Sequence, residues 1–276
     1  MTGKILIFDT YNVLHIARAG FKLGDYPVVY NFMRAFKAHV AEFKPDRVLF
    51  VTEGSPTHKK ALFSEYKANR IIAETETKKL AERAAFNRQK DLIIDLLKTS
   101  FPVSVMQHID YEADDTIANM VTLASQVTDW TLISTDTDFI QLLQTCKNLR
   151  LYNPVKKAFV EPPLYDYVTW KSLRGDGSDN IPGLSGIGDK TAEKYSSFNE
   201  AALRSTLSSS DYELFERNKS LIEFPKWTDE IRMSTQTWQG QLDLDKIKSF
   251  FEECGFASLT KDKYWNSFSE TFKTLA

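Results

Sequence analysis

The sequence predicts an α/β fold in which a central, mostly parallel sheet is flanked by helices on both faces. Short runs of β-branched and aromatic residues alternate with longer segments whose apolar residues recur at helical spacing. This alternation is typical of parallel sheets, because the crossover between two parallel strands usually carries a helix. After residue 165 the sequence becomes mostly helical, with turn residues between the segments. We therefore expect a core at 1–165 and a helical domain at 166–276.

The elements of the predicted core follow one another in a regular order. In the stretch 26–43, for example, apolar residues three and four apart indicate an amphipathic helix, which a proline then ends. The expected elements are a strand at Lys4–Phe8, a helix at Tyr26–Phe43, a strand at Arg47–Val51, a largely helical segment at Tyr66–Lys98, a strand at Val103–Met106, a helix at Ala113–Ala124, a strand at Thr131–Ile133, and an edge hairpin of Leu149–Tyr152 with Ala158–Val160. Farther along, the amphipathic segment Leu242–Phe251 is expected to pack back onto the body.

Composition excludes several classes of protein. Apolar residues make up 42% of the 276 residues, which is ample for a hydrophobic core. No apolar run approaches the roughly 18 residues that a membrane-spanning helix needs, and the first residues lack a signal-peptide pattern. Cys146 and Cys254, with four scattered histidines, form neither a zinc spacing nor a disulfide framework. We expect a soluble, cytoplasmic protein.

The net charge of −2 argues at face value against a nucleic-acid-binding protein, which usually has a basic surface. Two divalent cations bound by the acidic residues would bring the charge to +2, and the basic residues gather in particular stretches of the chain. Net charge alone therefore leaves nucleic-acid binding open.

Acidic residues lie just past the ends of four different predicted strands. These are Asp9, Glu53, Glu112 and Asp136. In a parallel sheet, ligands bind beyond the carboxyl ends of the strands, so we expect the four side chains to converge. Carboxylates at this density repel one another unless a cation neutralises them, and Mg²⁺ prefers oxygen ligands and phosphates. The sequence therefore predicts a metal site that acts on phosphate.

Further acids extend this set, and each has an alternative interpretation. Glu112, Asp114 and Asp115 could instead complement a helix N-terminus, and Asp136 could cap the helix that follows Asp138. Asp176 and Asp179 could belong to an ordinary turn. Neither capping alternative explains Asp9 and Glu53, which we expect to cap no long helix.

Two other segments point to phosphate contacts. Lys67 and Arg70 are three residues apart, so a helix would place them on one face. The alternative is a solvated charged helix. Gly183, Gly186 and Gly188 join two short predicted helices, and their backbone could approach a phosphate closely, although a generic helix–turn–helix connection is the alternative.

Five motifs occur together and in a particular order. They are IFDTYN around Asp9, Tyr66–Arg70 (YKANR), Tyr111–Asp115 (YEADD), Ser134–Asp138 (STDTD), and Gly175–Asn180 (GDGSDN) followed by Gly183–Gly188. This set resembles the metal-dependent 5′-nucleases, a flap endonuclease-like family that includes polymerase-associated 5′–3′ exonucleases and the phage type of ribonuclease H. Two positions depart from the family pattern: Glu53 stands where an aspartate is usual, and Thr10 where a Gly often follows the first Asp.

The resemblance implies a fold and an activity. It implies a PIN-like nuclease core, a helical arch at about 59–90, and a helix–three-turn–helix motif at about 173–198 in the second domain. The implied enzyme is a two-metal 5′–3′ exonuclease and flap endonuclease that removes RNA primers or 5′ flaps during DNA replication. Its cofactors would be two Mg²⁺ ions, for which Mn²⁺ can substitute, with K⁺ at the helix–three-turn–helix motif.

The resemblance also implies roles for individual residues. One ion would be held by Asp9, Glu53, Glu112 and Asp114, and the other by Asp136, Asp138, Asp176 and Asp179. Lys67 and Arg70 would be catalytic, and Tyr66 would stack on a terminal base. The remaining nucleic-acid contacts would come from Lys59, Lys60, Gly183, Gly186, Gly188 and Lys190.

The implied substrates are branched or nicked double-stranded DNA and RNA–DNA hybrids with a free 5′ end, selected by structure rather than sequence. Replication proteins such as a single-stranded-DNA-binding protein would be partners. We expect a monomer without membrane association, in the host cytoplasm if the protein is phage-encoded.

Three other classes remain. A phosphatase with Asp9 as nucleophile would need a second acid two residues on, where the chain has Tyr11. A smaller four-carboxylate ribonuclease would lack the hairpin at Gly183–Gly188. The third class is a structure-specific nucleic-acid-binding protein with weak or no cleavage, which Glu53 alone favours.

Overall fold

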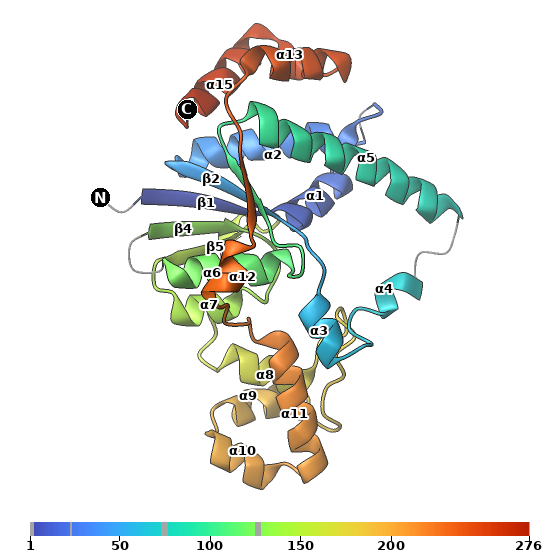
Figure 1. The fold of residues 1–276 in the computed structure, drawn as a ribbon, viewed down its shortest axis with the longest axis vertical. Helices are drawn as coiled ribbons and strands as arrows, with labels where there is room; N and C mark the ends of the chain where they lie inside the picture. The colour runs from blue at the N-terminus through green and yellow to red at the C-terminus, as the bar shows by residue number, and fades with distance from the viewer. Residues whose placement is uncertain (1–2, 23, 73–76, 125–127, 276) are drawn as a thin grey trace.

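A seven-stranded sheet runs through the protein in the order β6-β5-β4-β1-β2-β3-β7, as seen in a computed structural model that describes residues 3–22, 24–72, 77–124 and 128–275 (Figure 1). The strands are β1 (Gly3–Asp9), β2 (Arg47–Thr52), β3 (Ser104–Gln107), β4 (Thr128–Ile133), β5 (Leu149–Asn153), β6 (Ala158–Phe159) and β7 (Gln236–Gln239). Neighbouring strands from β5 to β3 are parallel, whereas the edge strands β6 and β7 are antiparallel to theirs. The predicted mixed α/β architecture is confirmed.

Alternation along β1 builds a core on each face of the sheet. Phe8 belongs to the core that α1 (Thr10–Ala19), α2 (Pro27–Phe43) and α5 (Thr77–Ser100) cover, and its ring lies 4.6 Å from that of Phe50. Ile7 points to the opposite core, under α6 (Ala113–Leu123) and α7 (Ile140–Thr145). Since successive side chains of a strand point to opposite faces, burial on both faces requires the nearly continuous apolar runs that these strands have.

Four helices form a separate layer at the lower end of the molecule (Figure 1). They are α8 (Tyr167–Arg174), α9 (Asp189–Ser196), α10 (Glu200–Thr206) and α11 (Ser209–Ile222), and they enclose an apolar cluster of their own around Leu173 and Phe215. The short helices α3 (Thr57–Leu62) and α4 (Asn69–Ile72) lie between this layer and the sheet (Figure 1). The loops between the sheet and the layer of α8–α11 therefore lie at the carboxyl edge of the sheet.

The C-terminal segment returns to the sheet and packs against the predicted core. After α12 (Asp229–Met233), β7 pairs with β3, and α13 (Leu244–Glu253), α14 (Ala257–Thr260) and α15 (Asp262–Lys273) pack over α2 and α5. The ring of Phe272 lies 4.7 Å from that of Phe36. Residues 236–275 thus complete the main core, as predicted for Leu242–Phe251, and the segment around α8–α11 forms a helical layer with its own apolar cluster.

The stretch 66–98 is less regular than the sequence predicts. Lys67 adopts a left-handed backbone with φ of 58°, turns occupy the residues before α4, and α5 begins at Thr77. The predicted arch at 59–90 includes residues 73–76, which lie outside the described residues. Among the residues that the structure describes, no helix has the length and apolar character needed to span a membrane.

Candidate active site

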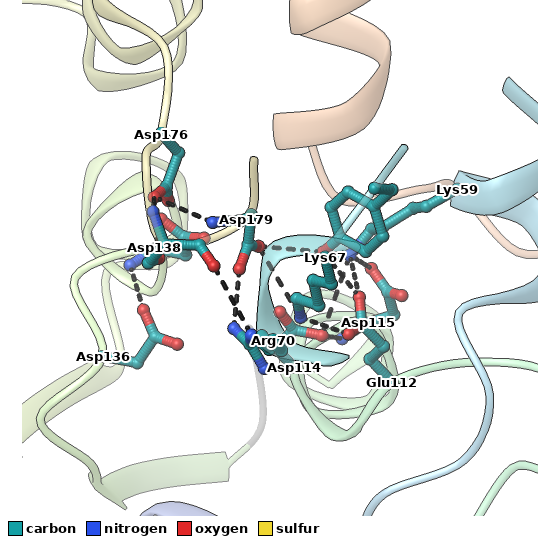
Figure 2. A network of polar contacts seen from close by, with 12 residues as sticks. Lys59, Lys67, Arg70, Glu112, Asp114, Asp115, Asp136, Asp138, Asp176 and Asp179 are labelled. Carbon is teal, nitrogen blue, oxygen red and sulfur yellow. Dashed lines mark hydrogen bonds and ion pairs between the residues drawn. The ribbon is translucent and has the colours of Figure 1, made fainter. Parts of the chain in front are cut away.

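The acids predicted to converge do come from neighbouring elements at the carboxyl edge of the sheet. Asp9 ends β1, Glu53 directly follows β2, Glu112 precedes the first turn of α6, and Asp136 lies three residues after β4. Figure 2 shows Asp136 and Asp138 on one side and Glu112 with Asp115 on the other. The alternation of strands and helices therefore gathers acids that are more than a hundred residues apart in the chain.

Asp9 caps α1 and Glu53 accepts the first N–H of α6, whereas we expected neither residue to cap a long helix. An oxygen of Asp9 accepts the N–H of Asn12 at 3.4 Å, at the start of α1, and the other accepts the Ser134 hydroxyl at 2.8 Å. Glu53 accepts the N–H of Ala113 at 3.0 Å. Gly54 permits this approach, because a Cβ there would lie 1.8 Å from the carbonyl oxygen of His108. These hydrogen bonds fix the orientation of both carboxylates and leave each a further lone pair for a ligand.

A first carboxylate group consists of Glu112, Asp114 and Asp115, whose oxygens lie within 4.8 Å of one another. Lys59 is almost fully buried, and its ammonium lies 2.9 Å from Glu112 and 3.0 Å from Asp115. Lys67 contacts the other oxygen of Glu112. Burial acts to raise the pKa of Glu112, but the charges of the two lysines outweigh it and lower that pKa to about 2. Glu112 is therefore ionised at neutral pH.

A second carboxylate group consists of Asp138, Asp176 and Asp179. The ammonium of Lys171 contacts Asp138 and lies 2.6 Å from Asp176. Asp179 accepts a hydrogen bond of 2.7 Å from the guanidinium of Arg70. Both carboxylate groups are thus held in place by cationic side chains of the protein.

Tyr66 and Asp114 connect the two groups. The Tyr66 hydroxyl lies 2.9 Å from an oxygen of Glu112 and 2.9 Å from one of Asp179, and its single proton can be donated to one at a time. Burial raises the pKa of Glu53 and of Asp138, and the Asp114 charge adds to the rise at both residues. The site is therefore one electrostatic unit rather than two independent clusters.

Lys67 and Arg70 converge by a turn rather than along a helix face. The Lys67 ammonium lies 3.6 Å from Asp179, the residue that Arg70 also contacts. A cavity of about 320 Å³ opens between the groups, lined by both bases and by acids that include Asp114, Asp136 and Asp138. The predicted pairing of these two bases at the acidic site is correct in geometry, although its predicted helical basis is wrong.

Two residues expected to contact nucleic acid are buried instead. Tyr66 is 2% exposed, so its ring offers no face for a base to stack on, and its hydroxyl bridges carboxylates. Lys59 is 3% exposed and paired with acids, so it cannot belong to an exposed basic strip. Lys60 and Lys190 are exposed, as phosphate contacts would require. These corrections turn Tyr66 and Lys59 into residues that organise the site.

The three loop glycines differ in their surroundings. A Cβ on Gly183 would lie 2.1 Å from the carbonyl oxygen of Arg174, so close packing of the chain requires that glycine. Gly186 and Gly188 face open space, and Gly186 has a φ of 75°. The backbone at these last two positions is accessible to a ligand.

Sequence reasoning missed Lys171, Ser134 and the 3.6 Å contact between His58 and Asp115. A lysine at position 171 follows the apolar residues of α8 and shows no pattern that marks it as a partner of Asp138. Ser134 lies within the STDTD motif, and that motif was the one signal that could have identified it.

Burial raises the pKa of Asp9 and of Glu53, and the charges of neighbouring acids add to the rise. Burial raises the pKa of Asp9 to about 7, although the hydrogen bond from Ser134 acts to lower it, and the Asp136 charge adds to the rise. Burial and the charges of Asp114 and Asp9 raise the pKa of Glu53 to about 8. The donor set consists of carboxylate oxygens, which are the ligands that Mg²⁺ and Mn²⁺ take. These residues therefore fit a divalent cation, which would remove the mutual repulsion.

We expect Mg²⁺ to stabilise the fold more strongly at pH 8 than at pH 6. Because the folded pKa values of Asp9 and Glu53 lie above those of an unfolded chain, the metal-free protein should lose stability as pH rises from about 4 to 8. Metal binding requires the deprotonated carboxylates and is therefore favoured at the upper end of this window. Melting temperatures measured with and without millimolar Mg²⁺ at both pH values test this. An equal Mg²⁺ effect at pH 6 and 8 would contradict it.

Comparisons with known proteins agree on one family. The family described as "5'-3' exonuclease, N-terminal resolvase-like domain" matches residues 3–166. The chain is 29% identical to the 5'-3' exonuclease of Bacillus subtilis over 211 residues, covering 70% of this chain and 67% of that protein. It is 30% identical to the ribonuclease H of Enterobacteria phage T4 over 191 residues, covering 61% of this chain and 62% of the phage protein. Against the DNA polymerase I of Caldicellulosiruptor bescii, it spans 25% of the relative's length.

Solved structures share the fold. A bacteriophage T5 D15 flap endonuclease, solved as a complex with DNA and metal ions, matches with a TM-score of 0.69 at 18% identity, covering 99% of each chain. The catalytic core of Rad2 in complex with a DNA substrate matches with a TM-score of 0.57 at 14% identity, covering 97% of this chain and 92% of the other. At these identities the likeness shows a shared PIN-like nuclease fold.

Proposed function

Because the chain belongs to the 5′–3′ exonuclease family, we propose that it is a structure-specific 5′-nuclease that hydrolyses phosphodiester bonds by two-metal-ion catalysis. One observation carries this proposal: acids from three separate segments line one cavity together with Lys67 and Arg70, namely Asp114, Asp136 with Asp138, and Asp176 with Asp179. Such an arrangement can neutralise a phosphate and hold it beside divalent cations. The proposed reactions are 5′–3′ exonuclease and flap endonuclease cleavage, and the proposed biological role is removal of RNA primers or 5′ flaps in DNA replication.

The proposed cofactors are two Mg²⁺ ions, for which Mn²⁺ can substitute. We assign one to Asp9, Glu53, Glu112 and Asp114, and the other to Asp136, Asp138, Asp176 and Asp179. When bound, such a pair supplies a metal-activated hydroxide and stabilises the leaving oxygen. The Asp114 charge acts on Glu53 and on Asp138, which we assign to different ions, and this supports a position of Asp114 between the two ions.

Lys67 and Arg70 are the proposed catalytic residues of the cavity wall, where each supplies a fixed positive charge. Both side chains lie beside Asp179, and Arg70 is half exposed, so its guanidinium can contact a substrate phosphate. Fixed cations at this position would stabilise the negative charge that develops on the phosphate in the transition state. Tyr66 would hold the carboxylates of Glu112 and Asp179 in position during this step.

The layer of α8–α11 is the proposed duplex-binding part, with the helix–three-turn–helix motif at about 173–198. The open backbone at Gly186 and Gly188 directly precedes α9, where helix N-terminal amides favour phosphate, and Lys190 is exposed there. Backbone contacts carry no sequence information, so selection would be by structure. Gly183 and exposed Lys60 would support the same contacts, and K⁺ at this motif is part of the proposal.

The proposed substrates are nicked or branched DNA and RNA–DNA hybrids with a free 5′ end. We further propose that the protein is a monomer with a single-stranded-DNA-binding protein as partner. Its proposed location is the cytoplasm, or the host cytoplasm for a phage protein. Complexes of the T5 flap endonuclease and Rad2 with DNA support nucleic acid as the ligand.

A binding protein with weak cleavage is the second candidate, and Glu53 favours it. Its oxygen accepts the Ala113 N–H, so part of its coordinating capacity is already used. Glu53→Asp distinguishes the two candidates: an inert parent that gains strong cleavage supports the binding protein, whereas an active parent supports the nuclease.

We expect cleavage of 5′-labelled flapped, nicked and RNA-primed duplexes in Mg²⁺ and none in chelator. Gel analysis of products from this panel measures both substrate choice and the position of the cut. Full activity in chelator, or no cleavage of any member with Mg²⁺ or Mn²⁺, would overturn the proposal. A covalently closed circular duplex, which has no free 5′ end, is the control substrate and should not be cleaved.

A further inference from the structure

Lys171 occupies the centre of the second carboxylate group. It lies on α8, is 7% exposed, and its ammonium contacts Asp138 and lies 2.6 Å from Asp176. These are two of the three acids whose oxygens converge within 4.8 Å. The ammonium therefore stands where positive charge is needed to hold the two carboxylates together.

The charge of Lys171 is required by its surroundings. A buried ammonium is costly unless anions surround it, and buried neighbouring carboxylates repel unless a cation separates them. The contacts with Asp138 and Asp176 meet both needs at once. The same contacts use one oxygen of each carboxylate, and a second divalent cation would compete with the ammonium for these two acids.

We propose that Lys171 is an internal counter-cation of the second metal site, and that a divalent cation must displace its ammonium from Asp138 and Asp176. This inference rests on the proposed function. Lys171 is thus a positioning residue that keeps the site assembled before metal binding and weakens the binding of the second ion. Because α8 carries Lys171, entry of that ion changes the contact between the helical layer and the STDTD loop.

The cavity beside Lys171 has room for its displaced side chain. Lys171 shares the wall of the 320 Å³ cavity with Trp170 and Arg174 on the same helix, next to the loop at Gly175. An ammonium that leaves the two carboxylates can remain in this cavity, where substrate phosphate would be held. Metal entry and phosphate binding are then coupled through one side chain.

The test counts Mn²⁺ ions and measures their affinities by calorimetry in the full chain, with no substrate present. We expect the parent to bind two ions with different affinities. In Lys171→Met and Lys171→Gln, the site of lower affinity should bind Mn²⁺ about tenfold more tightly than it does in the parent, equivalent to about 1.4 kcal/mol. Lys171→Arg, which keeps the cation, should bind no more tightly than the parent. Lys273→Met, which removes a lysine paired with Glu270 on the surface of α15, is the control and should match the parent.

Melting curves supply a second readout. Both neutral variants should melt at a lower temperature than the parent without metal, and Mn²⁺ should raise their melting temperature by more than it raises that of the parent. Lys171→Gln can still donate hydrogen bonds to the two acids, so it tests the proposal if Lys171→Met does not fold. Unchanged or weaker binding of the second ion in a folded neutral variant would overturn the inference while leaving the nuclease function intact. A parent that binds no Mn²⁺ and cleaves nothing would overturn the proposed function itself.

Discussion

Asp138→Asn is expected to slow cleavage roughly a thousandfold, equivalent to about 4 kcal/mol of transition-state stabilisation, with binding of a flapped duplex nearly unchanged. Asp138 lines the cavity and belongs to the second carboxylate group, so its loss removes a negative ligand from the proposed metal site. The fold should persist, because Lys171 keeps Asp176 as a partner. Single-turnover cleavage in Mg²⁺ and fluorescence anisotropy in Ca²⁺ separate the two effects.

A nearby Asp→Asn change provides the control for this experiment. Asp166 caps α8 by accepting the N–H of Thr169 at 2.7 Å, and asparagine caps helices about equally well. Asp166→Asn should therefore leave cleavage unchanged. If Asp138→Asn weakens binding as much as it slows cleavage, Asp138 has a structural role and not a catalytic one.

Lys67→Met should lower the cleavage rate on the order of a hundredfold, the scale reported for removing one preorganised electrostatic donor. Its ammonium lies between Glu112 and Asp179, at the junction of the two carboxylate groups. Glu112 keeps Lys59 and Tyr66 as partners, so the folded state should survive the change.

Rates measured at saturating substrate, with melting curves alongside, show whether the loss lies in the chemical step. Lys273→Met is again the matched change of a paired lysine far from the site. A Lys67→Met protein that cleaves at the parental rate would remove this residue from the proposed mechanism. A fall in melting temperature large enough to account for the lost rate would assign it a structural role.

The acids could be predicted from the sequence because strand ends are local signals. Asp9, Glu53 and Asp136 lie within three residues of the end of an apolar run, and parallel strands bring their carboxyl ends to one edge of the sheet. The resemblance of the motifs added Asp176 and Asp179, which periodicity alone does not connect to the sheet.

The cationic partners of those acids could not be predicted in the same way. Lys59 and Lys171 reach their carboxylates through tertiary packing, across 53 and 33 residues of chain, and no spacing rule encodes such a pairing. Tyr66 belongs to a recognised motif, but the motif does not say whether its ring is buried. Its hydroxyl bonds to residues 46 and 113 positions away decide that.

Short elements were missed for a related reason. β7 has the sequence QTWQ, in which a single apolar residue carries no alternation, and its pairing with β3 depends on the preceding chain having returned from the helical layer. The helix α1 begins directly after β1 without a turn signal, because Asp9 serves as strand end and helix cap at once. Local propensity does not predict the boundary between two elements where one residue belongs to both.

Anomalous diffraction from crystals soaked in Mn²⁺ tests most directly whether these acids jointly hold metal ions. We predict two peaks in the cavity, one beside Glu112 and Asp114 and one beside Asp138 and Asp176, with the Lys171 ammonium moved away from the latter pair. Mn²⁺ bound only outside this cavity, with Lys171 still in contact with Asp138 and Asp176, would contradict the assignment of a two-metal nuclease site.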